Sequence, residues 1–117
     1  MAVYYYNKQA NYKLKSADDT VSVSIVSGNG QSGSYMILKE MMFIGANETV
    51  YLGKAKELED VTIQISVTIQ DKLIETNWTG VIVIIAEGTE ITTYSYAEEL
   101  PADKDIAYYF IVLKLDK

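Results

Sequence analysis

The sequence predicts an all-β fold: an antiparallel two-sheet β-sandwich of seven or eight strands, with at most one short helical turn. Three observations support this: strict polar–apolar alternation in two segments, purely apolar runs of strand length in two others, and turn signals at short intervals between them. Short strands spaced in this way are typical of sandwiches and barrels. At 117 residues the chain has the size of one domain, so we expect a single sandwich over residues 1–117.

Two segments show the alternation expected of half-buried strands. Residues 61–70 alternate valine or isoleucine with threonine, glutamine or serine at every position. Residues 20–26 repeat the pattern, with Val21, Val23 and Ile25 on one face. A period of two with one wet face is typical of antiparallel sheets.

Two further segments are apolar on both faces. Residues 78–86 contain the run VIVII at 81–85, and residues 106–115 are apolar or aromatic at every position except Lys114. Runs of strand length without a polar face indicate strands that have neighbours on both sides. We therefore expect these two segments to be the central strands of the two sheets.

Three weaker strands complete the expected set. Tyr12 and Leu14 mark a strand near the N-terminus, and residues 50–52 mark a short one. Residues 89–97 form another. The good helix formers at 54–59 make a segment that is long enough for only one helical turn between strands.

The segment 34–44 is ambiguous between strand and helix. Its three methionines and Leu38 favour helix, whereas Tyr35, Ile37 and Phe43 favour strand. We expect a strand, because the neighbouring segments are strands, and a helix is the alternative.

The residue types that are absent narrow the possible activities. The chain has no cysteine or histidine, and all ten of its cationic side chains are lysines. Catalysis by Ser-His, Cys-His or zinc-hydroxide chemistry is therefore excluded. No spacing of carboxylates, or of serine and lysine, favours a particular catalytic pair, so we expect a protein that is not an enzyme.

Net charge and hydropathy exclude two further classes of partner. A net charge of −6 and the lack of arginine argue against nucleic acid and against an anionic membrane surface. The apolar runs are too short to span a membrane. The N-terminal residues lack the features of a secretory signal, so a cytoplasmic protein is the default expectation, or a secreted one if a leader has been removed.

Residues 28–33 read GNGQSG and match the glycine pattern of dinucleotide-binding loops. That pattern needs a helix after the loop, whose N-terminus holds the pyrophosphate. A flexible loop between two antiparallel strands explains the glycines equally well, and we favour it because the preceding strand alternates.

Aromatic residues give the clearest candidates for ligand binding. The chain has ten tyrosines and one tryptophan, and tyrosine suits binding surfaces because it has a flat apolar face and a polar tip. Tyr94, Tyr96 and Trp78 are the candidate platforms for stacking on carbohydrate rings. The alternative, which we favour, is that tyrosine fills half-buried sheet positions.

Carboxylates cluster in the expected loops, and Asp103 and Asp105 have the alternate spacing of a calcium-binding loop. Lys104 lies between them and opposes a cation. Solvated acidic turns are the commoner explanation, so we expect no cofactor, with calcium as the alternative.

The apolar run 81–85 would favour aggregation if it lay at an exposed edge, so it must be central or covered by a partner. We therefore expect self-association, most simply as a homo-oligomer. By elimination, the sequence predicts a non-catalytic binding or structural module that acts through its surface on a protein partner. The alternative is a carbohydrate-binding module.

Overall fold

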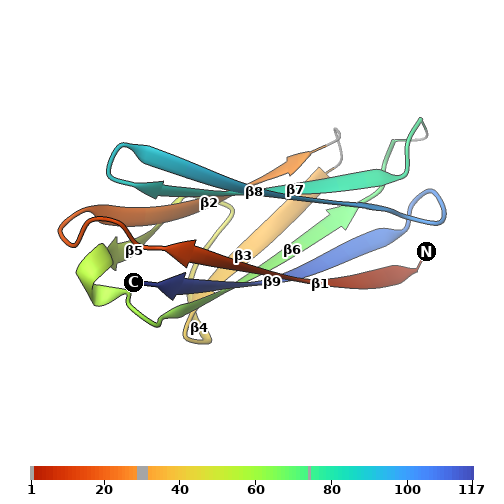
Figure 1. Cartoon of the computed structure of the whole chain (residues 1–117). Helices are drawn as coiled ribbons and strands as arrows, with labels where there is room; N and C mark the ends of the chain where they lie inside the picture. Colours follow the sequence, from red (N-terminus) through yellow and green to blue (C-terminus); the bar gives the residue numbers. More distant parts are fainter. Residues whose placement is uncertain (1, 29–31, 74) are drawn as a thin grey trace.

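The chain folds as two β-sheets packed face to face, which confirms the predicted β-sandwich (Figure 1). The computed structural model describes residues 2–28, 32–73 and 75–117. The five-stranded sheet has the order β1 (Val3–Lys13), β9 (Ile106–Asp116), β6 (Thr62–Gln70), β3 (Ser32–Lys39), β4 (Met42–Ala46). The four-stranded sheet has the order β5 (Val50–Lys54), β2 (Thr20–Gly28), β7 (Trp78–Glu87), β8 (Glu90–Glu99). The described residues thus form nine strands, one more than the upper prediction.

The core lies between the sheets and follows from the alternation in the sequence. The inward side chains of β6 are fully buried: Ile63, Ile65, Val67 and Ile69. They belong to the same apolar cluster as Val21 and Val23 of β2. Burying each such side chain contributes about 1.5–3 kcal/mol relative to leaving it exposed. As predicted, β7 and β9 are central strands, between β2 and β8 and between β1 and β6 respectively.

One strand pair departs from the expected antiparallel arrangement. β1 and β9 run parallel, with Val3 opposite Ile106 at one end and Lys13 opposite Asp116 at the other. The connecting strands return the chain to the end of the sandwich where β1 starts, so β9 enters the sheet in the same direction. The predicted N-terminal strand, marked by Tyr12, is the last part of this longer one.

Residues 34–44 are extended, as expected, but they belong to two strands. β3 and β4 form a hairpin whose turn residues, Glu40 and Met41, have φ values of 50° and 67°. β6 holds this turn in place: the Thr62 N–H donates to the Glu40 carboxylate (2.7 Å), and the Met41 N–H donates to Oε1 of Gln64 (2.9 Å). These tertiary contacts outweigh the local helix preference and account for the ninth strand.

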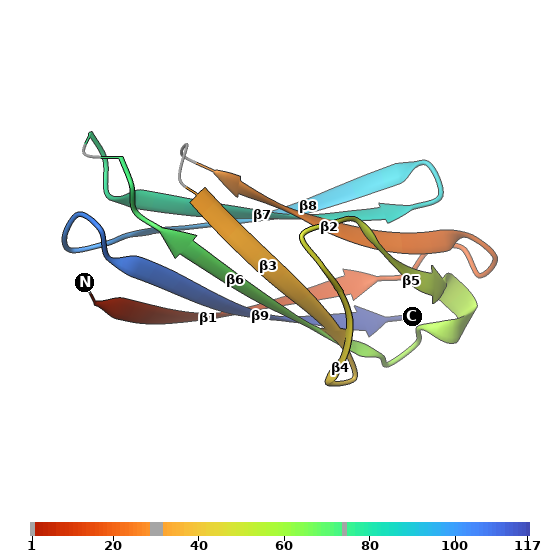
Figure 2. The same cartoon turned by 180° about the vertical axis from the view of Figure 1, so that it is seen from behind.

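The helix-forming residues 54–59 contain one 3-10 helix, η1 (Ala55–Glu57), as the sequence predicted. It lies at one end of the sandwich, where Ala55 and the adjacent Leu58 are buried in the core. Figure 2 shows η1 directly after β5. No helix in the described ranges is long and apolar enough to cross a membrane.

The glycine-rich segment 28–33 connects the two sheets, and its residues 29–31 lie outside the described residues. Gly28 ends β2, and Gly33 lies in β3. A strand therefore follows this segment, whereas a dinucleotide site needs a helix N-terminus there.

Candidate functional site

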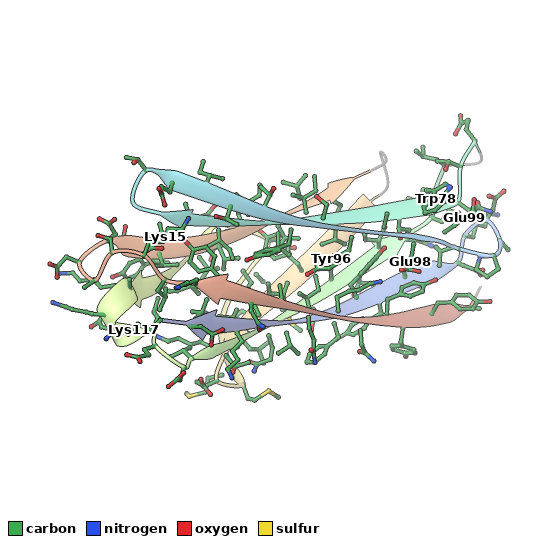
Figure 3. The ribbon with its side chains drawn as sticks, in the orientation of Figure 1. Lys15, Trp78, Tyr96, Glu98, Glu99 and Lys117 are labelled. Carbon is green, nitrogen blue, oxygen red and sulfur yellow. The ribbon has the colours of Figure 1, made fainter. Side chains whose placement is uncertain are left out.

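The two candidate tyrosines of β8 point inward and join the two sheets. The Tyr94 hydroxyl donates to the carbonyl oxygen of Asn11 (2.9 Å), and the Tyr96 hydroxyl donates to that of Gln9 (3.3 Å). Figure 3 shows Tyr96 in the space between β8 and β1. Burial raises the pKa of both hydroxyls above the ordinary tyrosine value. Both rings therefore lie along the side of the sandwich, with their polar tips bonded to backbone.

Trp78 is not part of the same surface. It begins β7 opposite Glu99, is 46% exposed, and lies at one end of the molecule (Figure 3). Neighbouring residues on a strand face opposite sides, and Thr79 faces the core. Trp78 therefore faces outward whereas Tyr94 and Tyr96 face inward, so the three rings do not form one stacking platform.

The aspartates of the β8–β9 loop have amide donors as partners. Asp105 is buried, and its Oδ1 accepts a hydrogen bond from the Ala2 N–H (2.9 Å). The Asn77 amide, assigned so that its NH₂ group donates, lies 2.6 Å from Oδ1 of Asp103 and 2.7 Å from Oδ2 of Asp71. Across the described ranges, no group of three or more acidic side chains is arranged to hold a metal ion.

A buried glutamate at the opposite end of the sandwich was not predicted. Glu87 is 2% exposed, and its carboxylate accepts hydrogen bonds from the Tyr12 hydroxyl (2.6 Å) and from the N–H groups of Lys15 (2.9 Å) and Ser16 (2.8 Å). Burial acts to raise the Glu87 pKa, but these hydrogen bonds and the Lys15 charge outweigh it, so the pKa is lowered. Burial of the Tyr12 hydroxyl raises the pKa of Tyr12, and its hydrogen bond to the Glu87 carboxylate raises it further.

This carboxylate has a structural role, since all its donors belong to β1 and the segment that follows it. The signal for it in the sequence was an acidic residue directly after the apolar run of β7, at a position that points inward by alternation. A buried charge requires several donors, so this position predicted a polar contact with a neighbouring element.

A cavity of about 290 Å³ lies next to this network. Its lining consists of Leu14, Lys15, Ser16, Ala17, Ala55, Lys56, Glu59 and Lys117. Two of its lysines form ion pairs: Lys15 Nζ lies 3.0 Å from Glu90, and Lys56 Nζ lies 3.1 Å from Asp18. Glu59 is the one acid in the lining, so the cavity does not hold the pair of carboxylates that acid–base hydrolysis needs.

A broad surface without charge covers part of the outer side of the five-stranded sheet, and the outward positions where β1 and β9 end carry Lys13, Lys114 and Asp116. The pairing registers place alternate residues of β1, β9, β6 and β3 there. We call it the uncharged face, and its side chains are Val3, Tyr5, Asn7, Gln9, Ile106, Tyr108, Phe110, Val112, Gln70, Thr68, Ser34, Met36 and Leu38, with Ser66 and Gln64 on the same side but buried beneath them. None of these side chains is an acid or a lysine, whereas charged residues usually make up about 25–35% of a domain surface.

Aromatic rings lie at one part of the uncharged face. The Tyr5 and Tyr108 rings are 5.6 Å apart between centroids, and Tyr5 is 70% exposed. The Tyr108 hydroxyl donates to Oγ of Ser66 (2.9 Å), which holds that ring in place. A shallow depression of about 250 Å³ lies nearby, lined by Gly33, Ser34, Thr68, Gln70 and Ile106.

The β3–β4 hairpin extends the uncharged face to the edge of the sheet. Phe43 pairs with Leu38 and is 62% exposed. Met41 lies in the turn and is 67% exposed, whereas Met42, which begins β4 opposite Lys39 and is 73% exposed, faces the other side of the strand from Phe43. Large apolar side chains at this exposure are typical of contact surfaces when they are grouped.

The outer side of the four-stranded sheet is also uncharged along its middle, between Lys54 and Glu99, but its side chains there are smaller. They include Ser22, Ser24, Val26, Gly80, Ile82, Ile84, Ala86, Ile91, Thr93, Ser95 and Ala97. The charged residues lie mainly in the loops, along the sides and at the two ends, where all three described ion pairs are found. The molecule measures 46 × 26 × 20 Å, and each of its two broad faces has an uncharged area.

Comparison of the chain with protein-family models, with curated proteins and with solved structures gave no match. The fold and the surface define its class as a β-sandwich with an uncharged area on each of its two broad faces.

Proposed function

We propose that this protein is a non-catalytic interaction module that binds a protein partner through the uncharged face. The observation that carries this proposal is that uncharged outward side chains of four neighbouring strands form one continuous area, in a chain of which 22% of the residues are charged. The centres of protein interfaces are depleted of charged residues and enriched in tyrosine, phenylalanine and methionine. Tyr5, Tyr108, Phe110 and Met36 supply these residue types.

The side of the molecule that holds this face is large enough for a stable contact. It is bounded by the two longer dimensions, 46 and 26 Å, which multiply to about 1,200 Å² for the whole side, and a standard interface takes ~800 Å² per partner. The Tyr5–Tyr108 pair supplies aromatic rings of the kind that interface hot spots use.

A protein partner is favoured over a carbohydrate by the contacts of the candidate tyrosines. Stacking on a sugar needs an exposed ring face, whereas Tyr94 and Tyr96 are half-buried and bonded to β1. The cavity next to Glu87 also favours a non-catalytic role. Two of its lysines, Lys15 and Lys56, are paired with acids, and its lining holds a single carboxylate, Glu59.

The test is site-specific photo-crosslinking in the cells that produce the protein. A photoreactive phenylalanine derivative replaces Tyr5 on the uncharged face, and in a matched control it replaces Tyr51, which is 58% exposed on the other sheet. We expect an adduct of one defined mass from position 5, its loss when Phe110→Lys is added, and no such adduct from position 51. Equal labelling from both positions, or none from position 5, would contradict the proposal.

A further inference from the structure

The two sheets have four edge strands, and three of them are protected against pairing with another chain. β4 and β5 on one side of the sandwich have five residues each. The pairing of each with its neighbour contains a register irregularity, between Ile37 and Leu38 for β4 and between Val21 and Ser22 for β5. Short, irregular edges are a common protection against edge-to-edge association. Figure 2 shows this side with β4 and β5 toward the viewer.

β1 is protected in a different way. Lys8 lies at an inward position of this edge strand and pairs with Glu98 across the sandwich (Nζ to Oε2, 2.7 Å). An inward charge on an edge strand is a second common protection. The carbonyl oxygens of Gln9 and Asn11 also accept hydrogen bonds from the β8 tyrosines, so they are engaged within the chain.

β8 has an inward charge beyond Ala97, at Glu98, but its segment from Ile91 to Ala97 has none of these protections. The strand has ten residues, its pairing with β7 shows no irregularity, and Ile91 to Ala97 contain no charge, no proline and no glycine. Within the described part of the chain, β7 is the strand that pairs with it. A segment of this length with high β propensity and no charge is prone to pair with another strand.

The turn before β8 indicates which backbone groups are free. Gly88, with φ of 58°, and Thr89 form a two-residue turn between Glu87 and Glu90. Such a turn makes its flanking residues a hydrogen-bonded pair, and the pairs then alternate along the hairpin. The N–H and C=O groups of Ile91, Thr93, Ser95 and Ala97 (the odd-numbered residues of the uncharged part) therefore point away from β7.

The acids at the two ends of this segment are already neutralised within the chain. Glu90 lies 3.0 Å from Lys15 Nζ, and Glu98 lies 2.7 Å from Lys8 Nζ. Two copies of β8 side by side would therefore bring together ion pairs, and not bare like charges. Because the protein has a net charge of −6, this local compensation matters for any contact between copies.

We propose that β8 pairs antiparallel with β8 of a second copy of this chain, so that the two four-stranded sheets continue into one another across a two-fold axis. A second copy is the occupant that the edges favour, since every molecule carries one open edge of identical sequence and three protected ones. One open edge per molecule closes the assembly at two copies, whereas two open edges would give a fibre. This contact uses the side of the sandwich and leaves the uncharged face free for the partner proposed above.

The first test is the mass of purified wild-type protein and of Thr93→Pro, measured by sedimentation equilibrium over a range of concentrations. Proline removes the outward N–H of Thr93 and is tolerated at such a position of an edge strand. The matched control, Thr93→Val, keeps the N–H and the β-branched shape. We expect wild type and the control to have twice the chain mass of 13.1 kDa, and the proline variant to have the mass of one chain.

A second variant keeps the inference testable if Thr93→Pro does not fold. Ser95→Lys adds a charge to the edge in each copy, and we expect it also to give single chains with an unchanged thermal unfolding midpoint at low concentration. Hydrogen exchange gives a direct reading: the Thr93 and Ser95 amides should be protected in wild type and exchange rapidly in Ser95→Lys.

Two outcomes would overturn the edge contact. One is a wild-type protein that stays a single chain at every concentration. The other is a dimer that survives Thr93→Pro and Ser95→Lys but dissociates in Phe110→Lys, which would place a second copy on the uncharged face. Failure of the crosslinking experiment at Tyr5, with the β8 dimer intact, would remove only the function proposed above.

Discussion

The Tyr12 hydroxyl donates a 2.6 Å hydrogen bond to the buried Glu87 carboxylate and so joins β1 of one sheet to β7 of the other. The next residues of the chain complete the contact, because the N–H groups of Lys15 and Ser16 donate to the same carboxylate. The Glu87 side chain therefore holds in place the segment between β1 and β2, which is the first connection between the two sheets.

Replacing Glu87 by glutamine should lower the free energy of unfolding by about 2–4 kcal/mol, because hydrogen bonds to a charged acceptor are lost and an amide NH₂ meets buried donors. The control is Glu99→Gln, at an exposed position. Urea denaturation of both variants measures the difference. A loss equal to that of the control would show that the buried contacts do not contribute to stability.

The contribution of Glu87 should depend on pH in the acid range. Its pKa in the folded protein is lowered from 4.5, so its stabilisation is fully present above the pKa of the unfolded chain and is lost as pH falls through the folded pKa. The difference in unfolding free energy between wild type and Glu87→Gln should therefore be constant near neutral pH and shrink below pH 4.5. A difference that grows on acidification would contradict the direction of this shift.

Met41→Gly should stabilise the β3–β4 hairpin. Met41 has a φ of 67°, which costs a residue with a side chain about 1–2 kcal/mol and costs glycine little. Greater freedom of glycine in the unfolded chain offsets part of this, so we expect a gain of about 0.5–1 kcal/mol. The control is Met42→Gly, in β4 and without a positive φ, which should destabilise. Thermal unfolding of the two variants should show midpoint shifts of opposite sign.

Gly88→Ala should destabilise the protein through the turn between β7 and β8. Gly88 has a φ of 58°, and a Cβ atom there would lie 2.8 Å from Oδ2 of Asp19. Backbone strain of this kind costs about 1 kcal/mol or more, and the close contact adds to it. In the control, Gly28→Ala, the new Cβ would meet only ordinary contacts, the nearest at 3.7 Å. A similar midpoint for both alanine variants would contradict the expectation.

Much of the fold could be predicted because the side-chain pattern of a strand is local. The alternation at residues 20–26 and 61–70 identified β2 and β6, and the apolar runs identified β7 and β9 as central strands. The single turn of η1 was confirmed for the same reason, since its helix formers are adjacent in the chain. Uncharged residues at alternate positions of β9 were also visible, but a pattern along one strand does not show which strands lie beside it.

The sequence by itself thus determined an all-β sandwich, its central strands and its lack of cysteine and histidine chemistry. Only the tertiary structure decided the parallel pairing of β1 with β9, the division of residues 34–44 into two strands, and the grouping of neutral side chains from four strands into one face. It also turned Tyr94 and Tyr96 toward β1. These features depend on contacts between residues far apart in the chain, and their energies decide among arrangements that local propensity leaves nearly equal.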